Sequence, residues 1–490
     1  MSVRRTIIGV LGVAILLFSP VFIVPLILAI IFQDPTIVAF TICSLLALGL
    51  GYAGFRFRGK NNSLRTRDSF LIVSTVYVCL SGLASLPFLL IPNTVPTFAD
   101  AVFEAASVVT TTGATVLVGL DDMPRSLLFY RQFVCWFGGM GIILLTVAIL
   151  PMLGIGGRQL VKAELPGDAK EVPVQLRVRE VALALWKIYL FLTVACAITF
   201  WIVGMSPFDA IAHAFSTVSI GGFSTHDANI GYFDSAAVET AIIVFVIISG
   251  CNFVLHHVAI HRTGDIGRIR HFFKTYFKDD EVLFYFLCLL IVCSLICGKL
   301  WISPGFDGNV LRDGIFHSVS FMTTTGFSTA DFSMWPVMCP VMLLFVSFTG
   351  ACSGSTGGGF KVFRILILFK QGIREIQQLI QPGAFFYAKL NNQRISERIL
   401  ESTVGFVAMY AAVFIVLLWS LMFVSSLDLD TAFSAVAACL NNLGPGLGQL
   451  AHNYQSLGSI EKYILVVAMI LGRLEIFTLL VLFAPRYWRR

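Results

Sequence analysis

Thr323-Thr324-Thr325-Gly326-Phe327 is one of four short stretches that share a central glycine and lie between strongly apolar segments. The other three are Thr110-Thr111-Thr112-Gly113-Ala114, Ser219-Ile220-Gly221-Gly222-Phe223 and Asn441-Asn442-Leu443-Gly444-Pro445. In chain order, the four glycines are separated by 109, 104 and 118 residues. Each interval is long enough for two membrane-spanning helices with a link between them, so the spacing predicts a fourfold internal repeat.

The residues before each glycine keep the same register. Thirteen residues earlier stand four residues that can cap a helix, namely Asp100, Asp209, Asp313 and Thr431. Six residues earlier stand four small residues, namely Ser107, Ser216, Ser320 and Ala438. We therefore predict that each glycine follows an N-capped helix of about ten residues, too short to span a bilayer. Irregular backbone at membrane depth must be buried in protein or line water, so four such re-entrant segments imply a shared aqueous axis.

The composition assigns the chain to the membrane. Of its 490 residues, 57% are hydrophobic and only 13% are charged, too few charges to cover a soluble globule. At about 20 residues per span, there is room for roughly ten spanning helices and little soluble domain. The net charge of +6 comes from clusters between apolar runs, so we exclude nucleic-acid binding. The 11 cysteines show no Cys-x-x-Cys spacing and indicate neither a zinc site nor a disulfide framework.

Ten uncharged or nearly uncharged runs are the candidate membrane helices. They are Ile7–Phe32, Thr36–Phe55, Phe70–Ile91, Val134–Leu150, Ile188–Gly204, Ala241–Ile260, Val282–Gly298, Trp335–Phe348, Thr403–Leu427 and Tyr463–Ala484. The basic clusters between them all fall on one side if the N-terminus is cytoplasmic, so we predict that both termini are cytoplasmic. The opposite loops are acidic. Such a mouth attracts cations, although acids also remain there when basic residues are kept inside.

The chemistry of the four loops suits a monovalent cation. K⁺ must exchange its hydration shell for oxygens that bind about as well as water, and rings of backbone carbonyls supply them. Glycine allows the strained dihedrals that such a loop needs, and the preceding helices point their negative C-terminal ends at it. The alternative is that the glycines only permit close packing, but four in register favour a filter. The predicted K⁺ site comprises Thr111, Thr112, Gly113, Ile220, Gly221, Gly222, Thr324, Thr325, Gly326, Asn442, Leu443 and Gly444.

A glycine-rich stretch interrupts the apolar run of the third repeat, from Gly350 to Gly359. Each glycine costs about 1 kcal/mol in a helix, so the stretch should unwind, and unwound chain at membrane depth belongs beside water. The alternatives are a short cytoplasmic turn or a phosphate-binding loop, and the second fails because Lys361 follows Phe360 rather than glycine. The predicted gate comprises Gly350, Ser353, Gly354, Ser355, Thr356, Gly357, Gly358, Gly359, Lys361 and Arg473.

Arg473 joins this group because it lies in the last apolar run, where a charge is costly and usually faces a cavity or a partner. A pore-facing arginine is an electrostatic barrier to cations beneath a filter. The alternative is a structural salt bridge, but Glu475, two residues on, points to another face of a helix. Four further intramembrane polar residues are assigned packing or supporting roles, namely Glu104, Asn252, His256 and His257.

Together these residues resemble the Trk/Ktr/HKT superfamily of potassium transporters, specifically its bacterial TrkH/TrkG branch. Similar signature stretches are Trp136-Phe137-Gly138-Gly139-Met140-Gly141-Ile142, Leu150-Pro151-Met152-Leu153-Gly154-Ile155-Gly156-Gly157 and Gly472-Arg473-Leu474-Glu475-Ile476-Phe477. The resemblance implies an all-α polytopic membrane protein with four repeats in a pseudo-fourfold arrangement, each a pore helix and loop between two spanning helices (M1–P–M2), plus an extra N-terminal helix pair. The implied segments are 1–67 for the pair and 68–157, 158–270, 271–381 and 382–490 for repeats 1 to 4.

The resemblance also implies a function and partners. It implies potassium uptake across the bacterial inner membrane, through a pore that the glycine-rich loop and Arg473 obstruct below the filter. Filter glycine in all four repeats goes with K⁺ selectivity in that family, and Gly113 argues against the sodium-permeable variant with serine there. Na⁺ and Rb⁺ are further candidate ions. The implied partners are a second copy of the chain and a cytosolic TrkA-like ring of RCK domains. The chain itself is expected to hold no cofactor, so nucleotides would act only through that ring.

Two other classes of protein are alternatives to a channel-like pore. An ion-coupled K⁺ symporter, driven by H⁺ or Na⁺, would have broken helices around a midplane site but typically inverted rather than parallel repeats. An intramembrane hydrolase would need paired carboxylates or a metal motif such as HExxH, which the sequence lacks, so no enzyme is predicted. The second and fourth loops depart from the Thr pattern of the other two, which leaves the strength of K⁺/Na⁺ discrimination open.

Overall fold

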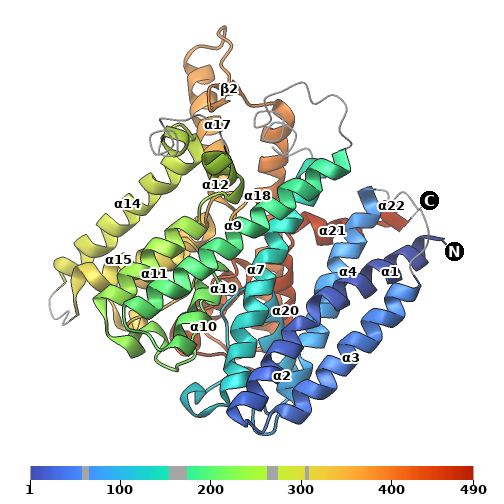
Figure 1. Cartoon of the computed structure of the whole chain (residues 1–490). Helices are drawn as coiled ribbons and strands as arrows, with labels where there is room; N and C mark the ends of the chain where they lie inside the picture. The colour runs from blue at the N-terminus through green and yellow to red at the C-terminus, as the bar shows by residue number, and fades with distance from the viewer. Residues whose placement is uncertain (1, 58–65, 154–173, 262–273, 304–307, 489–490) are drawn as a thin grey trace.

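The computed structural model describes residues 2–57, 66–153, 174–261, 274–303 and 308–488, whose regular secondary structure is almost entirely helical (Figure 1). Strands within these residues are confined to one antiparallel hairpin, formed by β1 (Lys389–Leu390) and β2 (Gln393–Arg394). The predicted all-α architecture is therefore confirmed.

The helices form an N-terminal pair and four similar groups, which correspond to the predicted repeats. The pair consists of α1 (Ser2–Phe18), which continues as α2 (Pro20–Phe32), and α3 (Ile37–Arg56). The groups begin with four long helices, α4 (Thr66–Ala84), α9 (Val174–Ile202), α14 (Asp280–Trp301) and α18 (Glu397–Val424). In the first group α4 is followed directly by the short α5 (Leu86–Leu90). The short helices before the glycines are α6 (Phe98–Val109), α10 (Pro207–Val218), α15 (Val310–Met322) and α19 (Leu429–Leu440). The first group closes with α7 (Arg125–Leu153), and the second closes with α11 (Ala236–Ser249) and α12 (Phe253–His261). The third closes with α16 (Met338–Thr349) and α17 (Val362–Ile380). The fourth closes with α20 (Ser459–Arg473), α21 (Phe477–Phe483) and α22 (Pro485–Trp488).

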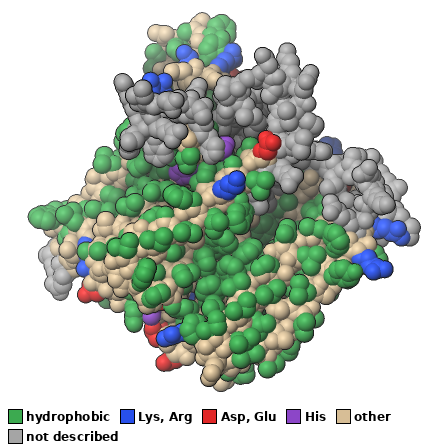
Figure 2. Space-filling model, viewed as in Figure 1, with side chains coloured by type: hydrophobic (Ala, Val, Ile, Leu, Met, Phe, Trp, Pro, Cys, Tyr) green, Lys and Arg blue, Asp and Glu red, His purple; other side chains and the backbone are tan. Residues whose placement is uncertain are grey.

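The surface of the helix bundle is suited to lipid. In Figure 2 hydrophobic side chains are spread over the lower half of the face viewed, where the few charged groups lie toward the margins. Within the described residues, six helices are long and apolar enough to cross a membrane, and two bent helix pairs also qualify. The chain is therefore a multi-pass membrane protein. In Figure 1 the start of α1 and the C-terminal helix α22 are drawn on the same side of the bundle. The basic residues predicted to face the cytoplasm at 158–170 and 262–270 lie outside the described residues.

Breaks in the closing helices are more frequent than predicted. The third repeat breaks between α16 and α17, as its glycine-rich sequence predicts. However, α11 and α12 meet at 88°, and α20 and α21 meet at 114°. The prediction of unbroken helices over Ala241–Ile260 and Tyr463–Ala484 is therefore wrong. Among the described closing helices, only α7 is continuous, over 29 residues.

The predicted N-caps of the short helices are also wrong, by three or four residues. The caps are Thr97, Ser206, Asn309 and Asp428, whose side chains accept backbone N–H groups of the first turn. Asp100 lies in the first turn instead, where its carboxylate accepts the backbone N–H and the hydroxyl of Thr97 and completes a capping box. Acidic residues are favoured both at the cap and in the first turn, so composition alone did not separate the two positions. The other misplaced caps are Asp209, Asp313 and Thr431.

Candidate ion pathway

The four glycine loops have the same backbone conformation. Two residues before the glycine, φ is 51° at Thr111, 56° at Ile220, 63° at Thr324 and 53° at Asn442. The glycines themselves have φ between 69° and 98°. A left-handed conformation is strained for Thr and especially for Ile, and it persists only where the surrounding structure imposes it. The strain therefore marks these loops as a candidate functional site.

Each short helix ends in the same hydrogen-bonded turn. The backbone N–H of Thr112 donates to Ser107 O at 2.9 Å, and that of Thr111 donates to Val108 O at 3.3 Å, which is a Schellman motif. The first of these bonds recurs at 2.8 Å in the other repeats, from Gly221 to Ser216, from Thr325 to Ser320 and from Leu443 to Ala438. The residue six before each glycine is therefore the acceptor that turns the chain into the loop.

The four loops touch one another in a closed ring. A methyl group built on Gly113 would lie 2.7 Å from the carbonyl oxygen of Gly221, in the loop of the next repeat. The same relationship holds at 2.0 Å from Gly222 to Thr325 O, at 2.1 Å from Gly326 to Leu443 O and at 2.7 Å from Gly444 to Thr112 O. Each glycine thus faces the carbonyl before the next glycine, and the fourth repeat closes on the first. A side chain at any of the four glycines would press on a neighbouring carbonyl, most severely at Gly222 and Gly326.

The ring is enclosed by protein. Eleven of the 12 predicted filter residues are buried, and Gly113 is partly exposed. Side chains link neighbouring loops, because Asn442 Nδ2 donates to Thr112 Oγ1 at 2.9 Å and to Met469 O at 3.0 Å. In loops 1 and 3 a hydroxyl pair supports the turn, between Thr110 and Thr112 at 2.7 Å and between Thr323 and Thr325 at 2.8 Å. The amide of Asn442 thus braces the one loop whose sequence has no Thr or Ser.

The glycine-rich loop between α16 and α17 lies against the C-terminal ends of the short helices. The hydroxyl of Thr356 donates to Val218 O, at the end of α10, at 3.0 Å. The backbone N–H of Gly358 donates to Thr324 Oγ1, in the third loop of the ring, at 2.6 Å. A short cytoplasmic turn does not make such contacts, so that alternative does not fit.

Glycine is needed at the points of closest approach. A methyl group on Gly358 would lie 1.9 Å from Asn441 O, and one on Gly357 would lie 2.7 Å from Thr323 O. The backbone N–H of Gly359 also donates to Asn441 O, at 3.1 Å. The glycines therefore let the loop pass directly beneath the ring, where side chains would collide with backbone.

Lys361 lies at the end of the glycine-rich loop, and its side chain bonds carbonyl groups of that loop. It is buried and has a left-handed φ of 73°. Its ammonium donates to Ser355 O at 3.4 Å and also to Gly357 O. The loop therefore folds around a cationic group that satisfies its inward carbonyls.

Arg473, at the end of α20, connects three elements. Its guanidinium donates to Thr356 O in the glycine-rich loop at 2.9 Å and to Gly138 O in α7 at 3.2 Å. Its side chain is buried, whereas Glu475 pairs with Arg364 at 2.5 Å. Arg473 therefore bonds backbone carbonyls, and Glu475 is not its salt-bridge partner. The reason differs from the predicted one, because Glu475 lies in the break after α20 and not on another face of a continuous helix.

The glycine-rich loop is also anchored to the break in repeat 2. The N–H of Cys352 donates to Gly250 O at 2.9 Å, and the N–H of Phe253 donates to Gly354 O at 3.3 Å. The side chain of Asn252 packs against Gly354. Asn252 thus has the supporting role expected for it. The break between α11 and α12, in which Asn252 lies, is not predicted from the sequence.

The other end of the loop contacts the start of repeat 3. The carboxylate of Glu281, in the first turn of α14, accepts the backbone N–H of Ser353. Neither Glu281 nor the break at Gly250 was singled out from the sequence. A second glycine follows each filter glycine by 28 residues, at Gly141, Gly250, Gly354 and Gly472. It lies at the break in repeats 2, 3 and 4 but inside the continuous α7 in repeat 1, so this glycine alone does not predict a break.

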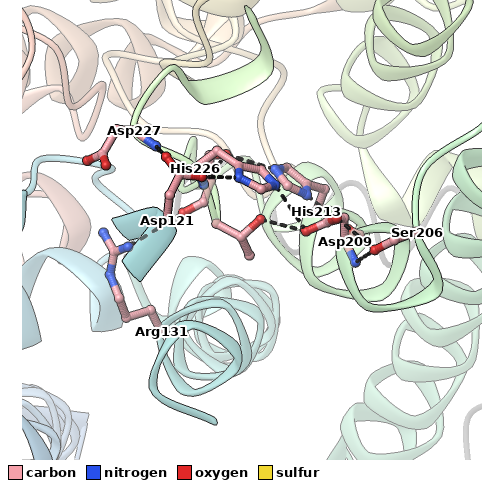
Figure 3. A network of polar contacts seen from close by, with 9 residues as sticks. Asp121, Arg131, Ser206, Asp209, His213, His226 and Asp227 are labelled. Carbon is pink, nitrogen blue, oxygen red and sulfur yellow. Dashed lines mark hydrogen bonds and ion pairs between the residues drawn. The ribbon is translucent and has the colours of Figure 1, made fainter. Parts of the chain in front are cut away.

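Outside the ring, one imidazole bridges repeats 1 and 2. His226 lies between Asp121, at 2.5 Å, and Asp209, at 3.4 Å (Figure 3). The ring of Tyr232 stacks on it with 3.5 Å between centroids. Burial disfavours the charged imidazole, but the hydrogen bonds to Asp209 and Asp121 outweigh burial and raise the pKa of His226. The protonated form therefore neutralises part of the acidic mouth.

Other acidic groups of the outer loops are neutralised in the same way. Asp100 is buried and pairs with Lys462 at 2.6 Å. Arg312 bonds both carboxylate oxygens of Glu239, at 2.7 and 2.8 Å, and Asp234 at 2.9 Å. The end of the bundle that carries these residues is thus less acidic than a count of its carboxylates suggests.

The enclosed ring of four loops and the broken helices around it define a polytopic membrane transport protein with a fourfold internal repeat. Residues 35–490 match the TrkH family, described as a cation transport protein. The chain belongs to this family and is a transporter rather than an enzyme.

Its relatives are similar over their full length. A Trk system potassium uptake protein TrkH from Vibrio parahaemolyticus is 47% identical, with 99% of each chain covered. The corresponding protein of Escherichia coli K12 is 46% identical and TrkG of the same strain 36%, again with 99% of each chain covered. The crystal structure of the potassium transporter TrkH from V. parahaemolyticus superposes with a TM-score of 0.90 at 44% identity, over 99% of this chain and 100% of that one.

Proposed function

We propose that this chain takes up K⁺ through the ring of four loops, as a channel-like pore rather than a coupled carrier. The observation that carries the proposal is the cyclic contact of each filter glycine with the carbonyl of the next repeat. This arrangement gathers four backbone carbonyls, those of Thr112, Gly221, Thr325 and Leu443, around one axis. Rings of carbonyls replace the hydration shell of K⁺ without adding fixed charge.

The surrounding backbone favours a cation at that axis. Each short helix directs its C-terminal, negative end at the loop that follows it. The strained left-handed residues are held by Schellman bonds and by the Asn442 and Thr hydroxyl contacts. A rigid ring discriminates between ions by the oxygens it presents, so these contacts serve selectivity as well as folding.

In this proposal the glycine-rich loop is the gate. It lies under the ring and is held there by Thr356, Gly358 and Gly359, and Arg473 bonds the carbonyl of Thr356. The guanidinium also places a positive charge in the path of a cation. Opening requires that the loop leave these partners, with Lys361 and the Gly250 break as its fixed ends.

The proposal includes the setting in which the pore works. We place the chain in the bacterial inner membrane with both termini cytoplasmic, as a homodimer regulated by a cytosolic TrkA-like ring. The bacterial relatives named as Trk system potassium uptake proteins support the bacterial membrane as the setting. The repeat boundaries at 68, 158, 271 and 382 stay predictions of the sequence.

The test is ion flux through purified protein in liposomes with no partner added. Rb⁺ and Na⁺ uptake are measured while the K⁺, Na⁺ and H⁺ gradients are set independently. The proposal expects downhill Rb⁺ flux that exceeds Na⁺ flux and needs no second gradient. Flux that starts only when a H⁺ or Na⁺ gradient is imposed would establish the symporter instead, a class in which broken helices are common.

A further inference from the structure

A fully buried ion pair lies behind the first loop of the ring. Arg131 Nε, on α7, donates to Glu104 Oε1, on α6, at 2.9 Å, and the two side chains are 1% and 0% exposed. Taking two charges out of water is costly, and a well-packed apolar pair often gives equal or greater stability. The pair therefore calls for an explanation other than stability.

The pair holds the segment that leaves loop 1. The hydroxyl of Thr115, two residues after Gly113, donates to Glu104 at 2.9 Å and accepts from Arg131 Nη2 at 3.1 Å. The backbone N–H of Val116 donates to Glu104 Oε2 at 3.0 Å. The carboxylate and the guanidinium together fix the chain where it emerges from the ring.

Arg131 also reaches the neighbouring loop. Its Nη1 lies 3.5 Å from Ser224 O, two residues after Gly222, and its guanidinium lies 5.1 Å from the centre of the Phe223 ring. One side chain therefore touches the exits of loops 1 and 2, which are neighbours in the ring. Figure 3 shows Arg131 beside the network of polar contacts that includes Asp121 and His226.

The repeats show that this position is used as a brace more than once. Glu104 stands nine residues before its filter glycine, and the equivalent residue in repeat 2 is His213. His213 Nδ1 faces Asp209 O at 2.9 Å, so it carries the proton, and Nε2 accepts from the hydroxyl of Ser224 at 2.9 Å. In both repeats the ninth residue before the glycine holds the second residue after it. Repeat 1 differs in using an ion pair that spans two loops.

We infer that Glu104 and Arg131 are positioning residues that fix the spacing of loops 1 and 2 and thereby the discrimination of K⁺ from Na⁺. The inference rests on the proposed filter. A displaced loop exit moves the adjoining carbonyls, and a ring that relaxes around a smaller ion loses its preference for the larger one. Neither side chain need contact the ion.

The decisive variant is Glu104→Leu/Arg131→Met, which replaces the pair by apolar groups and leaves no unpaired buried charge. The ratio of Rb⁺ to Na⁺ uptake is measured in liposomes, with monodispersity and thermal unfolding as measures of folding. The matched control is Glu239→Leu/Arg312→Met, which removes another ion pair, one that contacts α11 and α15 but no filter residue. The inference expects about a tenfold fall in the ratio for the first variant, on the scale of one hydrogen bond to a charged group, and little change for the control.

An unchanged ratio in folded Glu104→Leu/Arg131→Met protein would overturn the inference. If that variant does not fold, the ratio is measured in Thr115→Val, which removes only the hydroxyl that Glu104 and Arg131 both bond. An unchanged ratio in Thr115→Val would also overturn the inference. Gly113→Ser separates this inference from the proposed function. If Gly113→Ser lowers the ratio and the pair variant does not, only the positioning role fails. If neither does, the filter itself is wrong.

Discussion

Arg473 donates a hydrogen bond of 2.9 Å to the carbonyl of Thr356, which is 117 residues earlier in the chain. The bond joins the end of α20 in repeat 4 to the glycine-rich loop of repeat 3. The hydroxyl of the same Thr356 is bonded to the end of α10. One residue of the loop is thus bonded to two other elements, so Arg473 is a tether in addition to its proposed role as a charge in the path.

Removing this tether should open the pore. A hydrogen bond to a charged group contributes about 1.5–3 kcal/mol, so Arg473→Ala should raise Rb⁺ flux by roughly ten- to a hundredfold if the bond exists only in the closed state. The Rb⁺/Na⁺ ratio should stay close to wild type, because the ring is untouched. Liposome flux measures both quantities.

Arg473→Lys separates the tether from the barrier. Lysine keeps the charge but cannot bond both Thr356 O and Gly138 O with a fixed fork. Flux at the wild-type level in this variant would mean that charge alone closes the pore. Loss of folded protein in both variants would instead show that Arg473 is structural.

The closest contact in the ring predicts a strong effect at Gly222. Gly222→Ala would place a methyl group 2.0 Å from Thr325 O and should abolish most K⁺ flux. Gly119→Ala is the matched control, since Gly119 has a similar positive φ of 78° but no atom within 4 Å of the added methyl group. The control should cost only about 1 kcal/mol of stability, seen in thermal unfolding, and retain flux. Equal flux in the two variants would contradict the ring.

An added methyl group in the proposed gate should raise ion flux, whereas one in the ring should lower it. Gly358→Ala would place a methyl group 1.9 Å from Asn441 O, so the loop could not seat under the ring. Rb⁺ flux without a partner should rise, whereas Gly372→Ala in α17, where nothing lies within 4 Å, should leave it unchanged. A fall in flux for Gly358→Ala in folded protein would argue that the loop serves conduction rather than closure.

His226 should make stability depend on pH. Its pKa is raised in the folded protein, so its contribution is fully present below about pH 6.5, the value of a free imidazole, and is lost as pH rises through the higher folded value. His226→Gln should therefore destabilise the protein at pH 5.5, by about 1.5 kcal/mol, and hardly at all at pH 9. Thermal unfolding of the two proteins across this range tests it, with the exposed His452 changed to Gln as the control. A pH-independent difference would show that His226 acts by packing on Tyr232.

The repeat could be predicted from sequence because its signals are local. The glycine spacing, the small residue six before each glycine and the glycine cluster at 350–359 each reflect a backbone need at one place. The caps were misplaced because Asp100 and Thr97 both suit the start of a helix. The bends after Gly250 and Gly472 were hidden because one glycine within an apolar run is compatible with an unbroken membrane helix.

The long-range pairs had no such signal. Glu104 and Arg131 are 27 residues apart on different helices, and the sequence around either residue does not indicate the other as its partner. Arg473 was singled out for its charge, but its bonds to Thr356 and Gly138 depend on how three repeats close around one axis. Sequence thus indicates the groups of the proposed pathway, and the fold decides which of them meet.

The most direct test of the ring is to locate the ion. Crystals of the protein grown in Rb⁺ should show an anomalous scattering peak on the axis among the carbonyl oxygens of Thr112, Gly221, Thr325 and Leu443, and crystals grown in Na⁺ should not. Gly222→Ala crystals in Rb⁺ provide the control and should lose the peak. Protein that transports Rb⁺ in liposomes but shows no peak at the ring would contradict the account.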